Sequence, residues 1–466
     1  MTTQCTADRL DFKRLASRRV TAHFDGGDIT SDGGVLLLRE LEEKHRVIAR
    51  AVECFCDWRD QTRVEHSLEE LLRQRVFGLA LGYEDLNDHD ELRVDPAIAA
   101  AVGKSDPKGD ERAYERDQGK ALAGKSTLNR LELACDHGGK GHRYKPFECD
   151  FAAFENLLVE LWLDSFDEPP ESIILDADAT DFELCGDQQD KFFHGYYGHY
   201  CYLPLYIFCA DWLVASRLRR ADQDASKGTL RHLEVLVERV RSRWPKVNIV
   251  LRADSGFARD YIMSWCEDWQ VDYVIGLAKN SRLKARIVEP MAKARAAFEE
   301  SGEAARVFTE FRYETLDSWS KTRRVVAKSE YLWGDKENPR FVVTSLAKEQ
   351  YHARTLYEDI YCARGDAENR IREQLELFAD QMSTHWTKSN QLRQYLSGLA
   401  YVFICLLRRA AEGVGWQGLR PTTIRLRLLK IGAQVQVTAR RVWLRMASSC
   451  PWQQQFHAVL RRITGN

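Results

Sequence analysis

The chain has 466 residues, a formal net charge of −2, 44% hydrophobic residues and 30% charged residues. These values describe an ordinary soluble protein of about two or three domains and exclude a polycation. The twelve cysteines include no CxxC pair, no signal-peptide segment follows Met1, and no apolar run reaches the ~20 residues of a membrane span. We therefore expect a cytosolic protein in a reducing compartment, without a structural zinc site or a membrane segment.

The first part of the chain, residues 1–168, predicts a mainly helical region. Apolar residues recur at helical spacing in three stretches, and Pro96 begins a further short helix. The three stretches are Val35–Ala51, Ser67–Leu81 and Phe151–Phe166. Two Asp-Gly-Gly repeats, Asp25–Gly27 and Asp32–Gly34, predict turns. The prolines that follow Glu168 end this region and mark the main domain boundary.

Within this region, Gly119–Ser126 matches the phosphate-loop pattern GxxxxGK[ST]. A phosphate loop needs a buried strand directly before it, and the preceding residues are too polar for one. We therefore expect no nucleotide cofactor. The pattern instead predicts that Ser126 or Thr127 caps a short helix over Leu128–Glu132.

After the boundary, short apolar runs replace the helical pattern. They predict five strands, and helices are predicted over Thr229–Trp244 and Phe257–Trp269. The strands are Ile173–Asp178, Tyr202–Ala210, Leu213–Leu218, Val247–Ala253 and Val271–Leu277. The order β-β-β-α-β-α-β, with a helix to follow, predicts an α/β fold with a ribonuclease H-like mixed-sheet core whose first part covers residues 169–280.

Residues 281–348 interrupt this core. A charged helix over Arg282–Glu300 leads to three strand-like runs, which predict a β-rich insertion. The runs are Ala305–Tyr313, Arg323–Leu332 and Arg340–Thr344. Helices over Gln350–Phe378 and Asn390–Arg409 complete the core in residues 349–410. Residues 411–466 form a basic C-terminal region: from Cys405 to Asn466 there are eleven Lys or Arg and one acidic residue, which suggests a polyanionic partner.

Carboxylates at strand ends are the candidates for chemistry. Asp176 and Asp178 share one face of their strand, and Asp254 ends another strand of the same sheet. Glu368 lies on a helix stripe with Tyr361, Arg364 and Arg372. A few carboxylates suffice to bind paired Mg²⁺ ions when a substrate phosphate supplies further ligands. The competing interpretations are turn residues or helix caps for the aspartates and a surface ion-pair ladder for the helix.

These motifs resemble those of the DDE-type transposases of bacterial insertion sequences (group 1), whose ribonuclease H-like core carries a β-rich insertion. Asp178-Ala179-Thr180 is similar to the first Asp motif, and the resemblance continues through Gly186–Gln188 and His194–Gly198 to Tyr202–Leu205. Arg252–Phe257 resembles the second Asp motif, and Tyr361, Arg364 and Glu368 match the third. Leu375 stands where the family has Lys, and Arg372 is the cation that replaces it in our interpretation. Residues 125–132 also resemble a helical stretch that these proteins carry before the core.

The resemblance implies cut-and-paste transposition of an insertion sequence. Asp178, Asp254 and Glu368 are expected to be catalytic and to hold two Mg²⁺ (or Mn²⁺) ions, and this selects Asp178 over Asp176 as the ligand. Tyr361, Arg364 and Arg372 are expected to bind DNA. Residues 1–168 are expected to bind DNA as well. Trp319 and Trp333 of the insertion are expected to pack in its core or on its surface, with stacking on an extruded base as the alternative.

The expected partner is double-stranded DNA, both terminal inverted repeats and target, bound by a homodimer in the cytoplasm of a bacterium in association with the nucleoid. Three alternatives stay open at this point. They are a metal-dependent nuclease without strand transfer, a domesticated DNA-binding protein without catalysis, and a nucleotide hydrolase that uses Gly119–Ser126.

Overall fold

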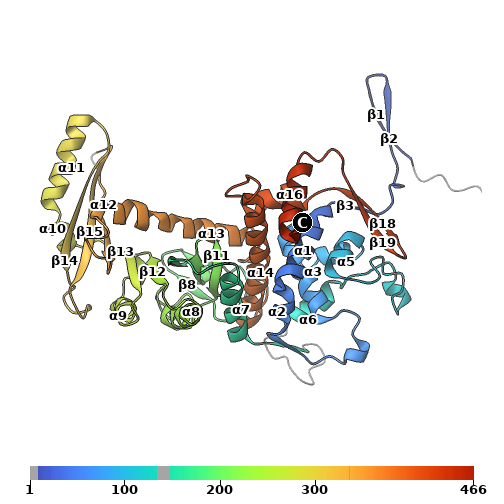
Figure 1. Ribbon diagram of the computed structural model, residues 1–466, viewed down its shortest axis with the longest axis horizontal. Helices are drawn as coiled ribbons and strands as arrows, with labels where there is room; N and C mark the ends of the chain where they lie inside the picture. Colours follow the sequence, from blue (N-terminus) through green and yellow to red (C-terminus); the bar gives the residue numbers. More distant parts are fainter. Residues whose placement is uncertain (1–8, 134–145, 335, 466) are drawn as a thin grey trace, which may run out of the picture. The chain divides into compact units, whose positions relative to one another are not determined.

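The computed structural model describes residues 9–133, 146–334 and 336–465 (Figure 1). It divides into two compact units. Unit 1 comprises Met1–Glu148 and Leu399–Asn466, and unit 2 comprises Cys149–Gly398. The helix expected over Phe151–Phe166 is α7 (Phe151–Leu163), which packs on a strand of unit 2. The division therefore lies before this helix, whereas the sequence interpretation put the main boundary after it.

Unit 2 is built on a mixed nine-stranded sheet of order β11-β10-β6-β12-β13-β17-β15-β14, with β16 paired to β15. β6, β12 and β13 are parallel to one another, and the other pairs are antiparallel. The strands are β6 (Ser172–Ala179), β10 (Leu205–Cys209), β11 (Trp212–Arg217), β12 (Asn248–Ala253), β13 (Asp272–Leu277), β14 (Ala305–Tyr313), β15 (Arg323–Leu332), β16 (Lys336–Glu337) and β17 (Arg340–Thr344). The mixed α/β class expected from the sequence is confirmed.

Apolar runs place the central strands in the core. Ile173, Leu175 and Ala177 are every second residue of β6, so they share one face of the strand. All three are buried, so this face lies in the core. α7 packs on β11 and on α8 (Thr229–Arg243), and α9 (Asp260–Asp268) packs on β13. A small three-stranded sheet stands beside them, with strands β7 (Phe182–Glu183), β9 (His199–Tyr202) and β8 (Phe192–His194).

The three strands predicted for the insertion are present as β14, β15 and β17. They do not form a separate sheet but continue the central sheet of unit 2. β17 pairs with β13, so the insertion continues from the edge of the core. The charged helix expected over Arg282–Glu300 divides into α10 (Ser281–Ala285) and α11 (Val288–Ser301), and α11 covers β14 and β15 (Figure 1). Buried valines at this junction, Val274, Val326 and Val342, make its apolar core continuous.

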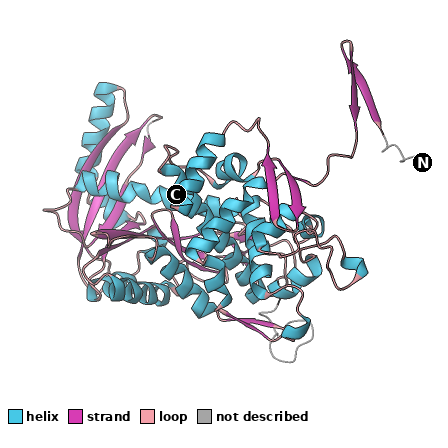
Figure 2. Ribbon diagram, turned by 45° about the vertical axis from the view of Figure 1, so that its right-hand side comes forward, coloured by secondary structure: helices cyan, strands magenta, loops and turns pink. Residues whose placement is uncertain are grey.

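Unit 1 is mainly helical, with small sheets (Figure 2). Its helices are α1 (Leu36–His45), α2 (Val47–Val52), α3 (Leu68–Leu81), α4 (Asp88–Leu92), α5 (Pro96–Val102), α6 (Lys125–Glu132), part of α14 (Thr387–Glu412), α15 (Pro421–Ile424) and α16 (Gln453–Thr464). Its sheets pair β1 (Leu10–Leu15) with β2 (Arg18–Ala22), β4 (Phe55–Asp57) with β5 (Phe147–Cys149), and β3 (Ile29–Thr30) with β18 (Ala433–Thr438) and β19 (Arg441–Met446). The C-terminal region thus folds with the N-terminal helices: β18 pairs with β3, and α16 packs on α1.

One local prediction in this part of unit 1 is wrong. The helix over Val35–Ala51 breaks at Arg46, which is left-handed (φ 53°), and the Glu42 carboxylate accepts hydrogen bonds from the amides that begin α2. The turn predicted at the second Asp-Gly-Gly repeat forms as the 3₁₀ turn η1 (Gly33–Val35), in which Gly33 and Gly34 are buried. A Cβ on Gly34 would collide with the Leu428 carbonyl, so close backbone packing requires glycine there.

Candidate active site

Two neighbouring parallel strands carry aspartates at the same level. Asp176 on β6 lies opposite Arg252 on β12, and Asp178 and Asp254 follow these residues by two positions. The Asp254 backbone stays extended (φ −77°, ψ −177°). Asp178 and Asp254 are therefore about one strand spacing apart, ~4.8 Å at the backbone, with side chains on the same face. The fold brings together the two strand-end aspartates that the sequence singles out.

Asp176 is engaged in a buried ion pair. Arg252 donates from Nε to Oδ1 at 2.5 Å and from Nη2 to Oδ2 at 2.7 Å, and its Nη1 donates to the Ile360 carbonyl at 2.7 Å. Burial raises the pKa of Asp176, although the hydrogen bonds from Arg252 oppose that shift. Both carboxylate oxygens are occupied, so Asp176 ties β6 to β12 and, through Arg252, to the helical segment that contains Ile360.

The third carboxylate lies on a helical segment that changes type along its length. The sequence predicts one helix over Gln350–Phe378. The structure has a short turn α12 (Ala353–Thr355), a π-helix η6 (Leu356–Tyr361), a 3₁₀ turn η7 (Cys362–Arg364) and then α13 (Gly365–Leu375). The 3₁₀ turn repeats every three residues and keeps Tyr361 in line with Arg364, and α13 keeps Arg364 in line with Glu368. α13 packs on β6 and β10.

Arg364 links the strand and helix carboxylates. Its Nη1 donates to Asp178 Oδ2 at 3.0 Å, and its Nη2 donates to Glu368 Oε1 at 2.5 Å. The Asp178 side chain is 10% exposed and that of Glu368 is 50% exposed, so the guanidinium spans from the buried end of the site to its open end.

Electrostatics place all three carboxylates within reach of one another. Burial raises the pKa of Asp178 to about 6; the negative charges of Asp254 and Glu368 add to this rise, and Arg364 opposes it. Like charges raise a carboxyl pKa in this way when they share a site. Tyr361 is influenced by the same cluster. Burial raises its pKa, the Asp254 charge adds to the rise, and the Arg364 charge opposes it.

A glycine on β13 makes room for this tyrosine. A Cβ on Gly276 would collide with the Tyr361 hydroxyl and would lie 3.0 Å from the Ser255 amide nitrogen. The helical segment can therefore approach the sheet closely only where β13 lacks a side chain.

Arg372 is not part of the cluster. It is exposed on α13, and in the described part of the chain no ion pair or hydrogen bond joins its side chain to the three carboxylates. Leu375, where the family has Lys, is 37% exposed.

The two tryptophans of the insertion differ in exposure. Trp319 is half-buried, edge-on to the Tyr313 ring (5.7 Å between centroids) and 5.6 Å from the Arg323 guanidinium carbon. Trp333 is 70% exposed and meets Phe298 edge-on. Trp333 therefore offers the freer ring face.

The donor chemistry of the cluster fits a hard divalent cation, since all three groups are carboxylates. Among the residues that the structure describes, however, no group of three or more His, Cys, Asp or Glu is arranged to hold a metal ion. Arg364 occupies one oxygen of Asp178 and one oxygen of Glu368.

Tyr197, which has no predicted role, lies where the Asp178 charge influences it. Burial raises the pKa of Tyr197 to about 12, and the charges of Asp181 and Asp178 add to the shift. Asp181 also holds His199, with 2.7 Å between Oδ2 and Nε2. The His194–Gly198 motif marks this segment in the sequence, but the influence of the Asp178 charge on Tyr197 depends on the folded chain.

The structure explains the phosphate-loop match in another way. α6 begins at Lys125 with Gly124 as its N-cap, so the expectation that Ser126 or Thr127 caps the helix is wrong. The Asp90 carboxylate accepts a hydrogen bond from the Lys125 amide at 3.0 Å and already places an anion at this helix end. A 3₁₀ turn, not a strand, lies before the loop, and Ala121 and Leu122 are buried.

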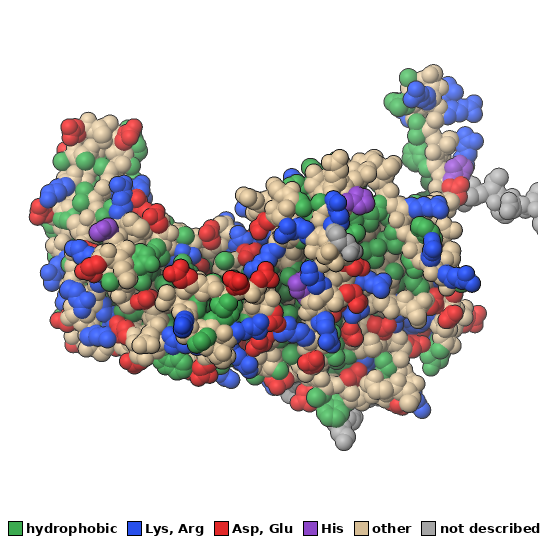
Figure 3. Space-filling view, in the orientation of Figure 1, with side chains coloured by type: hydrophobic (Ala, Val, Ile, Leu, Met, Phe, Trp, Pro, Cys, Tyr) green, Lys and Arg blue, Asp and Glu red, His purple; other side chains and the backbone are tan. Residues whose placement is uncertain are grey.

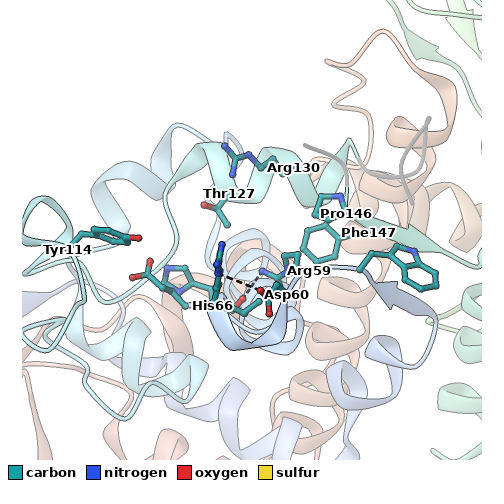
Figure 4. Close-up of a pocket in the computed structure, with 12 residues that line it drawn as sticks. Arg59, Asp60, His66, Tyr114, Thr127, Arg130, Pro146 and Phe147 are labelled. Atoms are coloured by element: carbon teal, nitrogen blue, oxygen red, sulfur yellow. Dashed lines mark hydrogen bonds and ion pairs between the residues drawn. The ribbon is translucent and has the colours of Figure 1, made fainter. Parts of the chain in front are cut away.

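Unit 1 also has an open pocket of about 650 Å³ (Figure 4). Its lining mixes cations such as Arg63 and Arg130 with the acids Asp60 and Glu65. His66, in its wall, is buried, and its Nε2 lies 3.1 Å from Arg112 Nη1. Burial lowers the pKa of His66 to about 3, so the ring is neutral near pH 7. The balance of charge favours no particular ligand.

In the described part of the chain, no helix is both long enough and apolar enough to cross a membrane. Comparison with curated protein sequences found no match. A family model described as transposase DDE domain, group 1, matches residues 12–465, nearly the whole chain. The two strand-end aspartates and the helix glutamate are the residue types for which this family is named. The chain belongs to the group 1 family of DDE-domain transposases.

Proposed function

We propose that this protein catalyses cut-and-paste transposition of an insertion sequence, by phosphodiester hydrolysis and strand transfer at terminal inverted repeats. The observation that carries the proposal is the parallel register of β6 and β12, which pairs Ala177 with Ala253 immediately before Asp178 and Asp254, together with Arg364, which joins Asp178 to Glu368. The sheet order β11-β10-β6-β12-β13, with three antiparallel and then parallel strands, supports a ribonuclease H-like core.

Asp178, Asp254 and Glu368 would hold two Mg²⁺ (or Mn²⁺) ions. When bound, such ions stabilise the attacking and leaving oxygens of the phosphodiester. The protein's part is to place the three carboxylates. Asp178 and Asp254 are fixed by the sheet register, whereas Glu368 sits on the half-exposed helix face, free to approach when Arg364 leaves it.

Arg364 and Tyr361 would then bind the DNA backbone. A guanidinium that leaves two carboxylates can bind a phosphate with the same two nitrogens, which suits bidentate recognition. Arg372, exposed further along α13, would contribute a more distant phosphate contact. The DNA partner includes both inverted repeats and the target. A homodimer would join the two ends, in the bacterial cytoplasm at the nucleoid.

The test is cleavage and joining of DNA that carries the ends of the element. Asp254→Ala is expected to abolish metal-dependent end cleavage and to leave DNA binding intact. Asp268→Ala, at an exposed position on α9, is the matched control and should cleave and join like the wild type. Cleavage by purified Asp254→Ala at the wild-type rate would sink the proposal, and cleavage without joined products would reduce it to a nuclease.

A further inference from the structure

The N-terminal strands β1 and β2 form a two-stranded ribbon that belongs to no larger sheet (Figure 2). All residues of β1 are exposed, and so are all residues of β2 except Ala22, which is half-buried. A lone two-stranded ribbon is only marginally stable in water. Its uncovered faces therefore point to a binding partner.

Away from its turn, the ribbon has a mainly apolar face; the register is irregular between Phe12 and Leu15, and Arg18 follows Val20 on that same face nearer the turn. Cross-strand pairing sets Leu10 opposite Ala22 and Phe12 opposite Val20, so these four side chains share a face. Alternation along the strands turns Lys13 and Arg19 to the other face. Leu10, Phe12 and Val20 are 41%, 56% and 38% exposed.

Positive charge gathers at the end of the ribbon. Lys13, Arg14, Arg18 and Arg19 flank its turn, and all four are exposed. Within the described residues, none of them has a carboxylate at ion-pair distance; the nearby acid Asp11 pairs with Arg9. Residues 9–24 hold five cations and one carboxylate, a net charge of +4 in a chain of net charge −2. Figure 3 shows this hairpin, at the upper right, as Lys and Arg side chains beside hydrophobic ones.

We propose that the β1–β2 ribbon is a DNA-binding element that enters the major groove of the duplex, with the four cations at its end on the phosphates. The major groove is wide enough to admit a two-stranded ribbon, and apolar side chains contact thymine methyl groups there. Cations on phosphate supply affinity by releasing counterions. A second copy of the chain would cover the apolar face as well, but it would bring two ribbons of charge +4 together.

This inference rests on the proposed function for the nature of the substrate, and its test is separate from catalysis. DNA binding is measured by fluorescence anisotropy in EDTA across a salt series. The probes are a duplex that carries the end of the element and a duplex of scrambled sequence. The full-length variants are Lys13→Gln/Arg14→Gln/Arg18→Gln/Arg19→Gln and the charge-preserving Lys13→Arg/Arg14→Lys/Arg18→Lys/Arg19→Lys.

Neutralising four phosphate contacts should lower the slope of log K against log salt by about 3 to 4 and weaken binding at least about tenfold near 0.1 M salt. The charge-preserving variant should keep the wild-type slope and affinity. If the wild type binds and the neutralised variant binds equally with an unchanged slope, the inference is overturned while the proposed function stands. The same holds if the neutralised variant changes only self-association in sedimentation. A wild type that binds neither duplex overturns both.

Discussion

At the residue level, Asp176 and Asp178 are two carboxylates on one strand face with opposite environments. Asp176 has both oxygens on the buried Arg252, whereas Asp178 is buried with like charges nearby, which raise its pKa to about 6. The first carboxylate stabilises the fold through its partner. The second is held at an energetic cost, as expected of a functional group.

Their substitutions should therefore differ in stability. Asp176→Asn leaves the Arg252 charge buried and should lower the free energy of unfolding by roughly 3–5 kcal/mol. Asp178→Asn should change it by less than about 1 kcal/mol or raise it, because a buried ionised group next to like charges is removed. Urea unfolding of the two variants measures both values, and equal losses would contradict these separate roles.

Arg364 gives a second prediction at this level. Its guanidinium occupies oxygens of Asp178 and Glu368, and its charge repels a cation. Arg364→Met should bind Mn²⁺ about tenfold more tightly than the wild type without DNA, a change of about 1.4 kcal/mol. Electron paramagnetic resonance of free Mn²⁺ measures this. Arg372→Met, exposed on the same helix, should leave the affinity unchanged; an equal gain in both variants would mean a general charge effect.

At the level of elements, Gly276 decides how closely η6 and η7 approach β13. Gly276→Ala drives a Cβ into the Tyr361 hydroxyl and should cost about 1–3 kcal/mol of stability. Gly365→Ala is the matched control, because its φ is −54° and, beyond its chain neighbours and its own helix backbone, no atom of the described residues lies within 4 Å of the added Cβ. Because alanine favours the helix more than glycine does, Gly365→Ala should raise the free energy of unfolding by about 0.5–1 kcal/mol. Thermal unfolding that ranks the two variants in the reverse order would refute this packing.

The elements also show what sequence can predict. The runs at 173–178, 247–253 and 271–277 form strands as expected, because apolar β-branched runs need no distant partner to be recognised. The break at Arg46 was missed because it depends on Glu42 capping the next helix. The change to a π-helix over Leu356–Tyr361 gives no signal in apolar spacing.

In the candidate site, too, local patterns predicted the strands, whereas the contacts between distant residues could not be predicted. The segments Asp-Ala-Asp at 176–178 and Arg-Ala-Asp at 252–254 have the same length. In the parallel register of β6 and β12, Asp176 lies opposite Arg252. That register depends on tertiary structure; strand periodicity alone left both aspartates as candidates, and only the resemblance of Asp178-Ala179-Thr180 to the first Asp motif selected Asp178. The hydrogen bond from Arg364 to Asp178 and the influence of the Asp178 charge on Tyr197 likewise depend on how the chain folds.

Across the whole molecule, the insertion and core share one sheet, because β17 pairs with β13. Unit 1 contains a fully buried histidine, His89. Its Nδ1 lies 3.2 Å from Gln74 Nε2. Burial lowers the pKa of His89 to about 3. Below its unfolded value of about 6.5, the unfolded chain binds a proton that the folded chain refuses.

Stability should therefore be complete above about pH 6.5 and fall as the pH approaches 3. His89 alone should account for about 3 kcal/mol between pH 6.5 and pH 4, at 1.36 kcal/mol per unit. Denaturant unfolding at several pH values measures the slope. His89→Gln should flatten it, whereas His352→Gln, at an exposed position, should not; a slope unchanged by His89→Gln would contradict the pKa assignment.

We propose that Asp178, Asp254 and Glu368 act as one catalytic cluster. The most direct measurement is the rate of Mg²⁺-dependent cleavage of DNA carrying the element's ends, for the three single alanine variants and the Asp178→Ala/Asp254→Ala double variant. Residues that act as a unit are non-additive, so each single variant should lose cleavage by at least about 10³-fold, and the double should lose no more. Partial losses of the cleavage rate that add up in the double variant would contradict a single catalytic cluster. So would cleavage at the wild-type rate by any single variant.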